Sequence, residues 1–215
     1  MPVSELTVDQ TRAMLIHVAN KIEENKDLLS AADRAIGDGD HGIGMARGFA
    51  AVRDKLQTGA FASVGDVFKA TGMALMMSIG GAAGAVFGTL FMGGARNLMQ
   101  RQCFGSHELS QMLADGLQAV QERGKAKPGD KTMVDALQPA AEAARQAVTA
   151  PLASVLPLVA EAARQGMENT KQMVAAVGKA KTLGERSLGH PDPGAVSTYL
   201  ILDAMCEYVA GVAPV

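Results

Sequence analysis

The stretch that decides the architecture and the chemistry of this chain is Asp33-Arg34-Ala35-Ile36-Gly37-Asp38-Gly39-Asp40-His41-Gly42-Ile43-Gly44. It places three carboxylates within eight residues, and its glycines tolerate positive φ and so allow the backbone to turn sharply. Alternate residues of an extended chain point the same way, so Asp38 and Asp40 can share a side. Crowded carboxylates repel one another unless a cation lies between them. Hard oxygen ligands on a glycine-rich loop suit Mg²⁺ or Ca²⁺ better than zinc.

The residues after the acidic loop add a second kind of ligand. His41 stands beside the acids, and the amides of Gly42–Gly44 lead into an expected helix start, where backbone N–H groups attract phosphate. Together these features indicate a site for a Mg-nucleotide. The simpler alternative is an Asp-Gly turn capped by Asp40, which needs no ligand. An EF-hand does not fit, because glycine and Phe49 fall where its fifth and twelfth positions require other residues. The Walker pattern is absent.

Composition narrows the class of protein. The 215 residues suit a single domain spanning 1–215, and 48% of them are apolar, enough for a sizeable core. A net charge of −2 gives no electrostatic footprint for nucleic acid, and 4% aromatic residues without Trp provide no base-stacking platform. Two distant cysteines, Cys103 and Cys206, are typical of a reduced, cytoplasmic protein. The N-terminus carries no secretory signal.

Apolar residues recur at helical spacing almost throughout, and no strand alternation stands out. We therefore predict an all-α bundle of seven to nine helices. Ser63 and Asp130 are expected to cap helices, and Pro139 is expected to kink or divide one. The helices are expected at residues 7–29 and 45–56, from Ser63, from Ser106, after Asp130, and at 154–177 and 195–212.

Residues 70–95 contain no charge, a run long enough to cross a membrane. Seven glycines interrupt the run and neither flank is a basic cluster, so we expect no membrane span. Residues 78–84 are predicted to form a loop between two buried helices. The spacing of Gly80, Gly84 and Gly88 fits close helix packing, and it fits a second phosphate-cradling loop equally well.

Four segments together resemble a known family. In chain order they are Asp33 with Ile36–Gly42, then Gly80–Gly84, Lys127–Met133 and Leu183–Gly194. As a set they are similar to the signature of the nucleotide-binding L subunit of dihydroxyacetone kinase, and the resemblance covers essentially the whole chain. It implies an eight-helix antiparallel barrel with the nucleotide at one end, held in inter-helix loops.

The resemblance also implies the site residues. The Mg²⁺ ligands, for two ions, fall on Asp33, Asp38 and Asp40. No catalytic residue is assured in this chain. The nucleotide, ADP or ATP, is expected to contact His41, Gly42, Ile43, Gly44, Gly81, Ala82, Ala83, Gly124, Thr132, Met133, Lys179, Asp192, Pro193 and Gly194.

The chain departs from the family pattern at three of these positions. Gly44 stands where Asn is usual, Ala83 where Ser is frequent, and Lys179 where Arg is common, so a point charge replaces a planar fork. None of the three is an expected metal ligand. The changes bear instead on nucleotide affinity.

The predicted function is phosphoryl transfer from a Mg-nucleotide to dihydroxyacetone held by a separate substrate-binding K subunit. ADP recharged by a phosphohistidine-carrying M subunit, or exchangeable ATP, would supply the phosphoryl group, and a homodimer is possible. The alternatives are a kinase subunit for another ketose such as erythrulose, a non-catalytic nucleotide-dependent regulator, and a metal-binding module without nucleotide.

Overall fold

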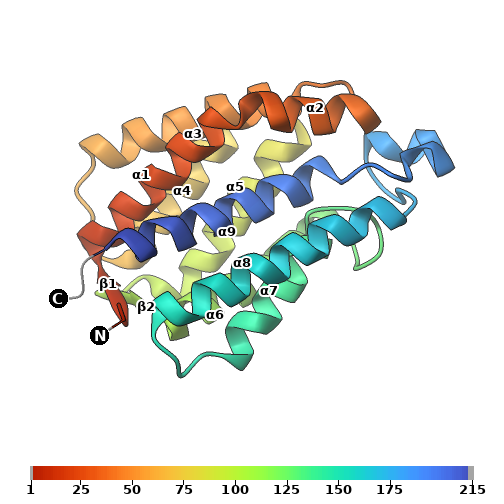
Figure 1. The fold of residues 1–215 in the computed structure, drawn as a ribbon. Helices are drawn as coiled ribbons and strands as arrows, with labels where there is room; N and C mark the ends of the chain where they lie inside the picture. Colours follow the sequence, from red (N-terminus) through yellow and green to blue (C-terminus); the bar gives the residue numbers. More distant parts are fainter. Residues whose placement is uncertain (1, 213–215) are drawn as a thin grey trace.

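A computed structural model describes residues 2–212 and consists of helices with one pair of short strands (Figure 1). The strands are β1 (Glu5–Thr7) and β2 (Cys103–Gly105), which pair antiparallel with Leu6 opposite Phe104. The helices are α1 (Val8–Glu24), α2 (Lys26–Ile36), α3 (His41–Thr58), α4 (Val64–Ser78), α5 (Gly81–Ala95), α6 (Ser106–Gly124), α7 (Val134–Gln146), α8 (Leu152–Asn169) and α9 (Pro193–Gly211), with 3-10 turns η1 (Arg96–Leu98), η2 (Thr170–Gln172) and η3 (Lys179–Ser187).

Most helices pack against the next helix along the chain, and the series closes on itself. From α3 to α9 each helix contacts its successor, and α1 contacts both α3 and α9. The remaining helix, α2, continues from α1 and packs against α3 and α9. The apolar face of each helix is therefore buried inside the ring.

The core inside the ring is aliphatic with a small aromatic centre. Phe68 lies with its ring centroid 5.2 Å from that of Phe104 and 6.2 Å from that of Phe91, and all three side chains are buried. Within the described residues, none of the helices has the length and apolar character needed to cross a membrane.

The glycine-rich run permits close helix packing, one of the two purposes left open by its sequence, and its role toward phosphate stays a prediction. Gly72 of α4 and Gly88 of α5 face each other, and a Cβ on either would come within 3.0 Å of the other's carbonyl oxygen, so they permit close helix approach. Gly80 and Gly81 instead adopt positive φ of 76° and 57° in the turn where α5 begins. The predicted loop at 78–84 is thus reduced to a short turn after Ser78.

Several helix boundaries differ from those predicted. The single helix expected at residues 7–29 is broken at Asn25, whose amide group donates to the carbonyl of Lys21 at 2.8 Å and ends α1. The helix expected at 154–177 runs only from Leu152 to Asn169. α7 continues through Pro139 without being divided, so the expected division there is wrong.

The cap expected from Asp130 is also wrong. The carboxylate of Asp130 accepts from the N–H of Lys127 at 2.7 Å and closes a turn ahead of the helix. The loop amides are instead bound by Asp135, in the first turn of α7. Its carboxylate accepts from the N–H of Gly129 at 2.5 Å and from the N–H of Thr132 at 2.7 Å.

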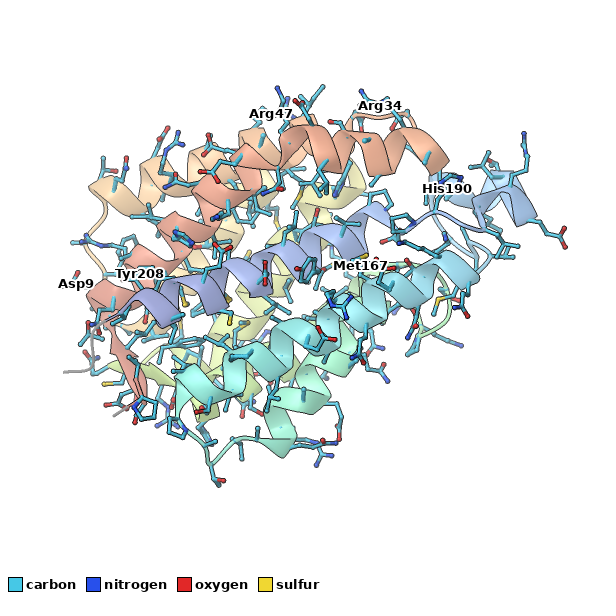
Figure 2. The ribbon with its side chains drawn as sticks, viewed as in Figure 1. Asp9, Arg34, Arg47, Met167, His190 and Tyr208 are labelled. Carbon is cyan, nitrogen blue, oxygen red and sulfur yellow. The ribbon has the colours of Figure 1, made fainter. Side chains whose placement is uncertain are left out.

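The connections that carry the conspicuous motifs gather at one end of the ring. In Figure 1 the α2–α3 turn, the segment before α7 and η3 all lie away from the β1–β2 pair. Figure 2 shows the same polarity at single residues, since Asp9 and Tyr208 lie toward the strand end and His190 lies at the opposite end.

Candidate functional site

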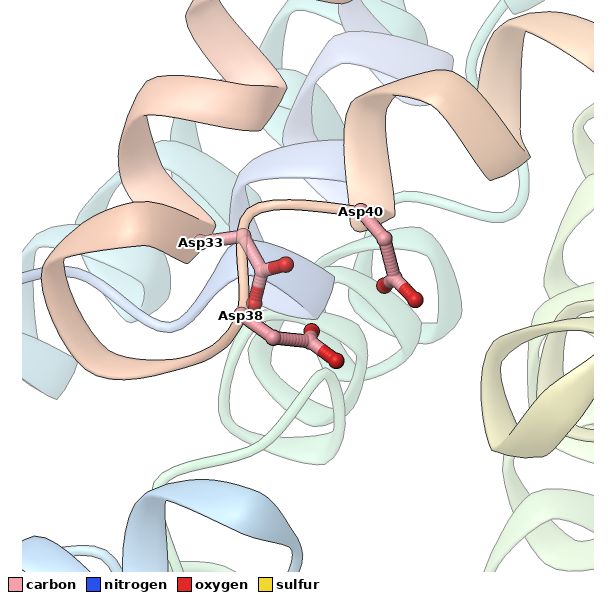
Figure 3. A group of neighbouring side chains, drawn as sticks. All are labelled: Asp33, Asp38 and Asp40. Carbon is pink, nitrogen blue, oxygen red and sulfur yellow. The ribbon is translucent and has the colours of Figure 1, made fainter.

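Three aspartates converge where α2 turns into α3. Asp33 comes from the last turns of α2, and Asp38 and Asp40 come from the turn itself (Figure 3). Each offers a carboxylate oxygen within 4.8 Å of the others. Asp33 is buried, whereas Asp38 and Asp40 are exposed. A small cluster with one fixed and two accessible carboxylates can hold a hard divalent cation.

Local contacts of the turn hold Asp33 in place. The N–H of His41, the first residue of α3, donates to the Asp33 carboxylate at 3.1 Å. A Cβ at Gly37 would lie 2.2 Å from that carboxylate, so a larger residue there would displace the Asp33 side chain. Asp40 occupies the N-cap position of α3 but makes no side-chain cap bond. Its carboxylate is therefore not used as the simple helix cap of the turn interpretation.

A lysine from a distant part of the chain neutralises the exposed acids. The Lys179 ammonium, at the start of η3, donates to the Asp38 carboxylate and lies 3.8 Å from that of Asp40. This hydrogen bond lowers the pKa of Asp38 and raises the pKa of Lys179. The repulsion expected between the acids is thus already relieved by Lys179.

The N-termini of two helices lie at the cavity that contains the three aspartates. α3 begins at His41 and α5 begins at Gly81, and the first amides of a helix have no intrahelical acceptor. Arg47 joins the two helix starts, because its guanidinium donates to the carbonyls of Ser78 at 2.7 Å and Ile79 at 2.6 Å. Both starts line the same cavity as the aspartates, which suits an anionic ligand.

The cavity has a volume of about 740 Å³, large enough for a nucleotide-sized molecule. Its lining includes every residue predicted from the sequence except Gly42. Gly42 is buried against α2, where a Cβ would lie 2.2 Å from the carbonyl oxygen of Lys26. The predicted residues that line it are Asp33, Asp38, Asp40, His41, Ile43, Gly44, Gly81, Ala82, Ala83, Gly124, Thr132, Met133, Lys179, Asp192, Pro193 and Gly194.

Another part of the cavity wall is formed by the starts of α7 and α9. Asp192 caps α9 by accepting from the N–H of Ala195 at 2.8 Å. Part of Asp192 lines the cavity, but burial in the wall raises the pKa of its carboxyl to about 7, even though the Ala195 bond and the Lys131 charge act to lower it. This wall therefore carries a carboxyl that gains and loses its proton near neutral pH.

His41 is less free than its neighbours in sequence suggest. Its ring Nε2 lies 2.8 Å from the hydroxyl of Ser197 on α9, and its ring packs near that of Phe87. Burial lowers the pKa of His41, although Asp33 and Asp40 oppose the effect. His41 thus contributes an oriented ring, and its backbone N–H is used by Asp33.

Sequence reasoning missed part of the lining. The apolar members could not be told from ordinary core residues by spacing alone. Arg47 carried no signal beyond a charge in a helix, and Lys131 none beyond its place in the Lys127–Met133 segment. Their backbone-carbonyl partners appear only in the fold. The missed lining residues are Ile36, Gly37, Arg47, Ile79, Gly80, Val86, Phe87, Val120, Ala126, Lys131, Val134, Val177, Gly178 and Ala180.

Similar known proteins identify the family of this chain. Residues 35–207 match the family model of the DAK2 domain. The chain is 44% identical over 183 residues to the ADP-binding subunit DhaL of the PEP-dependent dihydroxyacetone kinase of Escherichia coli, covering 83% of this chain and 86% of that protein. The chain belongs to the DAK2 family of dihydroxyacetone kinase L subunits. This confirms the resemblance.

Two further matches agree with the family. The DAK2 chain is 38% identical over 205 residues to the ADP-binding subunit DhaL of the PTS-dependent dihydroxyacetone kinase of Lactococcus lactis, covering 95% of this chain and all of that one. It superposes with a TM-score of 0.72 and 26% identity on the crystal structure of the dihydroxyacetone kinase from C. freundii in complex with AMP-PNP and Mg²⁺. That alignment covers 92% of this DAK2 chain and 33% of the longer C. freundii chain.

The donor set of this DAK2 chain fits Mg²⁺. All three candidate ligands are carboxylates, and neither sulfur nor a free imidazole faces them, since His41 is turned to Ser197. Oxygen-only ligands of this kind favour Mg²⁺ over zinc or copper.

Proposed function

We propose that this chain is the ADP-binding subunit of a dihydroxyacetone kinase. In this role it holds a Mg-nucleotide in the 740 Å³ cavity and presents its terminal phosphoryl group to dihydroxyacetone bound by a separate K subunit. The observation that carries the proposal is the convergence of Asp33, Asp38 and Asp40 with the N-termini of α3 and α5 on one cavity. The similarity to two ADP-binding subunits supports it.

Asp33, Asp38 and Asp40 would hold Mg²⁺, two ions in the proposed site. When bound, Mg²⁺ neutralises charge on the phosphate oxygens during transfer. Asp33 provides the fixed ligand, because His41 N–H and burial hold its carboxylate in place. Asp38 and Asp40 lie beside Lys179, and they would become available to the metal if the Lys179 ammonium turned toward the phosphates.

The backbone amides at the start of α3 and α5 would orient the phosphates. At Ala83 this chain lacks the side-chain donor that the family pattern often supplies, so a phosphate contact there would come from the main-chain N–H. The N–H of Gly44 donates to the Asp40 carbonyl at 2.9 Å, so nothing replaces the side-chain contact that is missing at this position. The apolar side of the cavity, including Val86, Phe87 and Val120, would pack against the nucleoside.

The partners follow from what the chain is proposed to do. A K subunit supplies the keto-sugar and the groups that activate its hydroxyl, and this chain supplies the phosphoryl donor. Because the similar proteins belong to PEP- and PTS-dependent kinases, we favour ADP that stays bound and is recharged by a phosphohistidine-carrying M subunit.

The same proposal extends to the architecture. The closed series of helix contacts supports an eight-helix antiparallel barrel in one domain, with α2 as the continuation of α1 and the nucleotide at the loop end. A cytoplasmic location is proposed as well, in keeping with a kinase subunit.

A reconstituted reaction tests the function. The purified chain is mixed with a K subunit, dihydroxyacetone and Mg²⁺, with either ATP or ADP plus a phosphorylated M subunit. We expect dihydroxyacetone phosphate only when the chain is present, and faster formation with the M subunit than with ATP. Transfer to erythrulose but not to dihydroxyacetone would replace the proposed substrate, and no transfer despite nucleotide binding would favour a regulatory role.

A further inference from the structure

Lys131 is buried in a position that side-chain ammonium groups rarely occupy. The residue is 2% exposed and has a φ of 62°, which is unusual for any residue other than glycine. An outlier of this kind persists only where its surroundings determine it. Lys125, on the same connection, also has positive φ but is exposed.

The contacts of Lys131 explain why it stays there. Its ammonium donates to the carbonyl of Thr170 at 2.5 Å and to that of His190 at 2.6 Å. Thr170 ends α8, and His190 lies on the connection that leads from η3 to α9. One side chain thus ties the segment before α7 to the end of α8 and to the segment before α9.

Further bonds make Thr170 the centre of this junction. Its hydroxyl accepts from the N–H of Asp192 at 2.9 Å and donates to the carbonyl of Met167 at 2.6 Å. A Cβ at Gly194 would lie 3.3 Å from that of Met133, so the starts of α7 and α9 touch within the cavity wall. A change at Lys131 is therefore expected to affect the start of α7 and the start of α9 together.

We propose that Lys131 is a positioning residue for the nucleotide: by bonding to Thr170 and His190 it holds Thr132–Met133 and Asp192–Gly194 at the spacing the nucleoside requires. The inference rests on the proposed function for the identity of the ligand. The coupling of the two segments rests on the hydrogen bonds alone. Lys131 acts through its neighbours, in contrast to Lys179, which faces the acids.

The test compares Lys131→Met with Lys125→Met and the wild type. Titration calorimetry measures Mg-ADP affinity, and hydrogen exchange of the ligand-free proteins measures local opening. Lys131→Met should lower affinity at least tenfold and speed exchange at residues 127–133 and 188–195, while α4 and α5 exchange as in the wild type. Lys125→Met should change neither. If Lys131→Met does not fold, Lys131→Arg is used, and its longer, planar head should still weaken Mg-ADP several-fold.

Wild-type affinity retained by the Lys131 variant would overturn the inference. Exchange that rises evenly over all helices would also overturn it, because that result marks a general loss of stability. Failure of the wild type to bind Mg-ADP would refute the proposed function instead, and the local exchange pattern would still decide whether Lys131 couples the two segments.

Discussion

The acidic cluster depends on a balance of charges between individual residues. Lys179 bonds to Asp38 and lies near Asp40, so the acids are paired before any metal arrives. A cation that enters the site must displace this ammonium, and a polyphosphate that accompanies the cation offers the ammonium a new partner. The metal and the nucleotide should therefore bind better together than either does alone.

Replacing Asp38 tests its assignment as a ligand. Asp38→Asn removes one candidate ligand. It should lower the affinity for Mg-ADP at least about tenfold, a factor typical of substitutions at metal sites. Because Asp38 is paired with Lys179, the change should not stabilise the ligand-free protein. Calorimetry and thermal unfolding measure the two effects. Asp54→Asn, an exposed change on α3, is the matched control, and equal affinities for the two variants would remove Asp38 from the site.

The carboxyl group of Asp192 is expected to make the stability of the folded protein depend on pH. Its pKa is raised to about 7 by burial, from an ordinary value of 3.8. The folded state therefore keeps a proton that the unfolded state has lost, and stability falls as pH rises from about 4 through 7. Asp192→Asn keeps a cap for α9 but cannot ionise.

The measurement is urea unfolding of both ligand-free proteins at several pH values. Relative to the wild type, Asp192→Asn should gain stability between pH 4 and pH 8, on the order of 2–4 kcal/mol. A difference that stays constant over this range would show that the carboxyl does not titrate in the folded protein.

Among the secondary-structure elements, the junctions α2–α3 and α4–α5 carry the phosphate side of the site. Arg47 of α3 holds the carbonyls of Ser78 and Ile79 and so fixes the start of α5. Arg47→Met should weaken Mg-ADP about fivefold, the effect of a lost hydrogen bond of about 1 kcal/mol. The matched control is Arg53→Met on the same helix as Arg47, which removes ion pairs with Glu23 of α1 and with Asp54. An equal loss in both variants would contradict a specific role for Arg47.

Gly42 shows how closely α3 approaches α2. A Cβ there would lie 2.2 Å from the Lys26 carbonyl oxygen and 2.6 Å from the Ser30 nitrogen, and neither backbone atom can move cheaply. Gly42→Ala should lower the free energy of unfolding by about 1–3 kcal/mol, the usual cost of overpacking. Denaturant unfolding measures it beside Gly211→Ala, where a Cβ meets nothing within 4 Å. Equal stability of the two variants would refute the close approach.

The sequence predicted elements where apolar spacing and caps were regular, and missed breaks that depend on one local bond. α4 begins after its Ser63 cap as expected. The end of α1 depends on the Asn25 amide, which apolar periodicity does not register. Similarly, Lys131 lies within the Lys127–Met133 segment noted in the sequence, but only the fold shows that its side chain is buried. Most predicted site residues meet at one cavity because their motifs lie on connections at one end of the ring.

For the whole molecule, binding of a ligand across four inter-helix connections should stabilise the folded state. Mg-ADP at a hundred times its dissociation constant should add about 2.7 kcal/mol, which corresponds to a rise in Tm of about 5–10 °C for a chain of this length. Thermal unfolding with ADP, with and without EDTA, measures it. The increase in Tm should vanish when EDTA removes the metal. An equal increase without metal would show that the aspartates take no part in nucleotide binding.

The most direct test is a crystal structure of the chain grown with ADP and Mn²⁺ in place of Mg²⁺, with anomalous scattering locating the metal. The expected result is Mn²⁺ on Asp33, Asp38 and Asp40, phosphates against the amides of Gly81–Ala83, and Lys179 turned from the acids to the phosphates. Metal absent from the three carboxylates, or a nucleotide bound outside this cavity, would contradict the assignment.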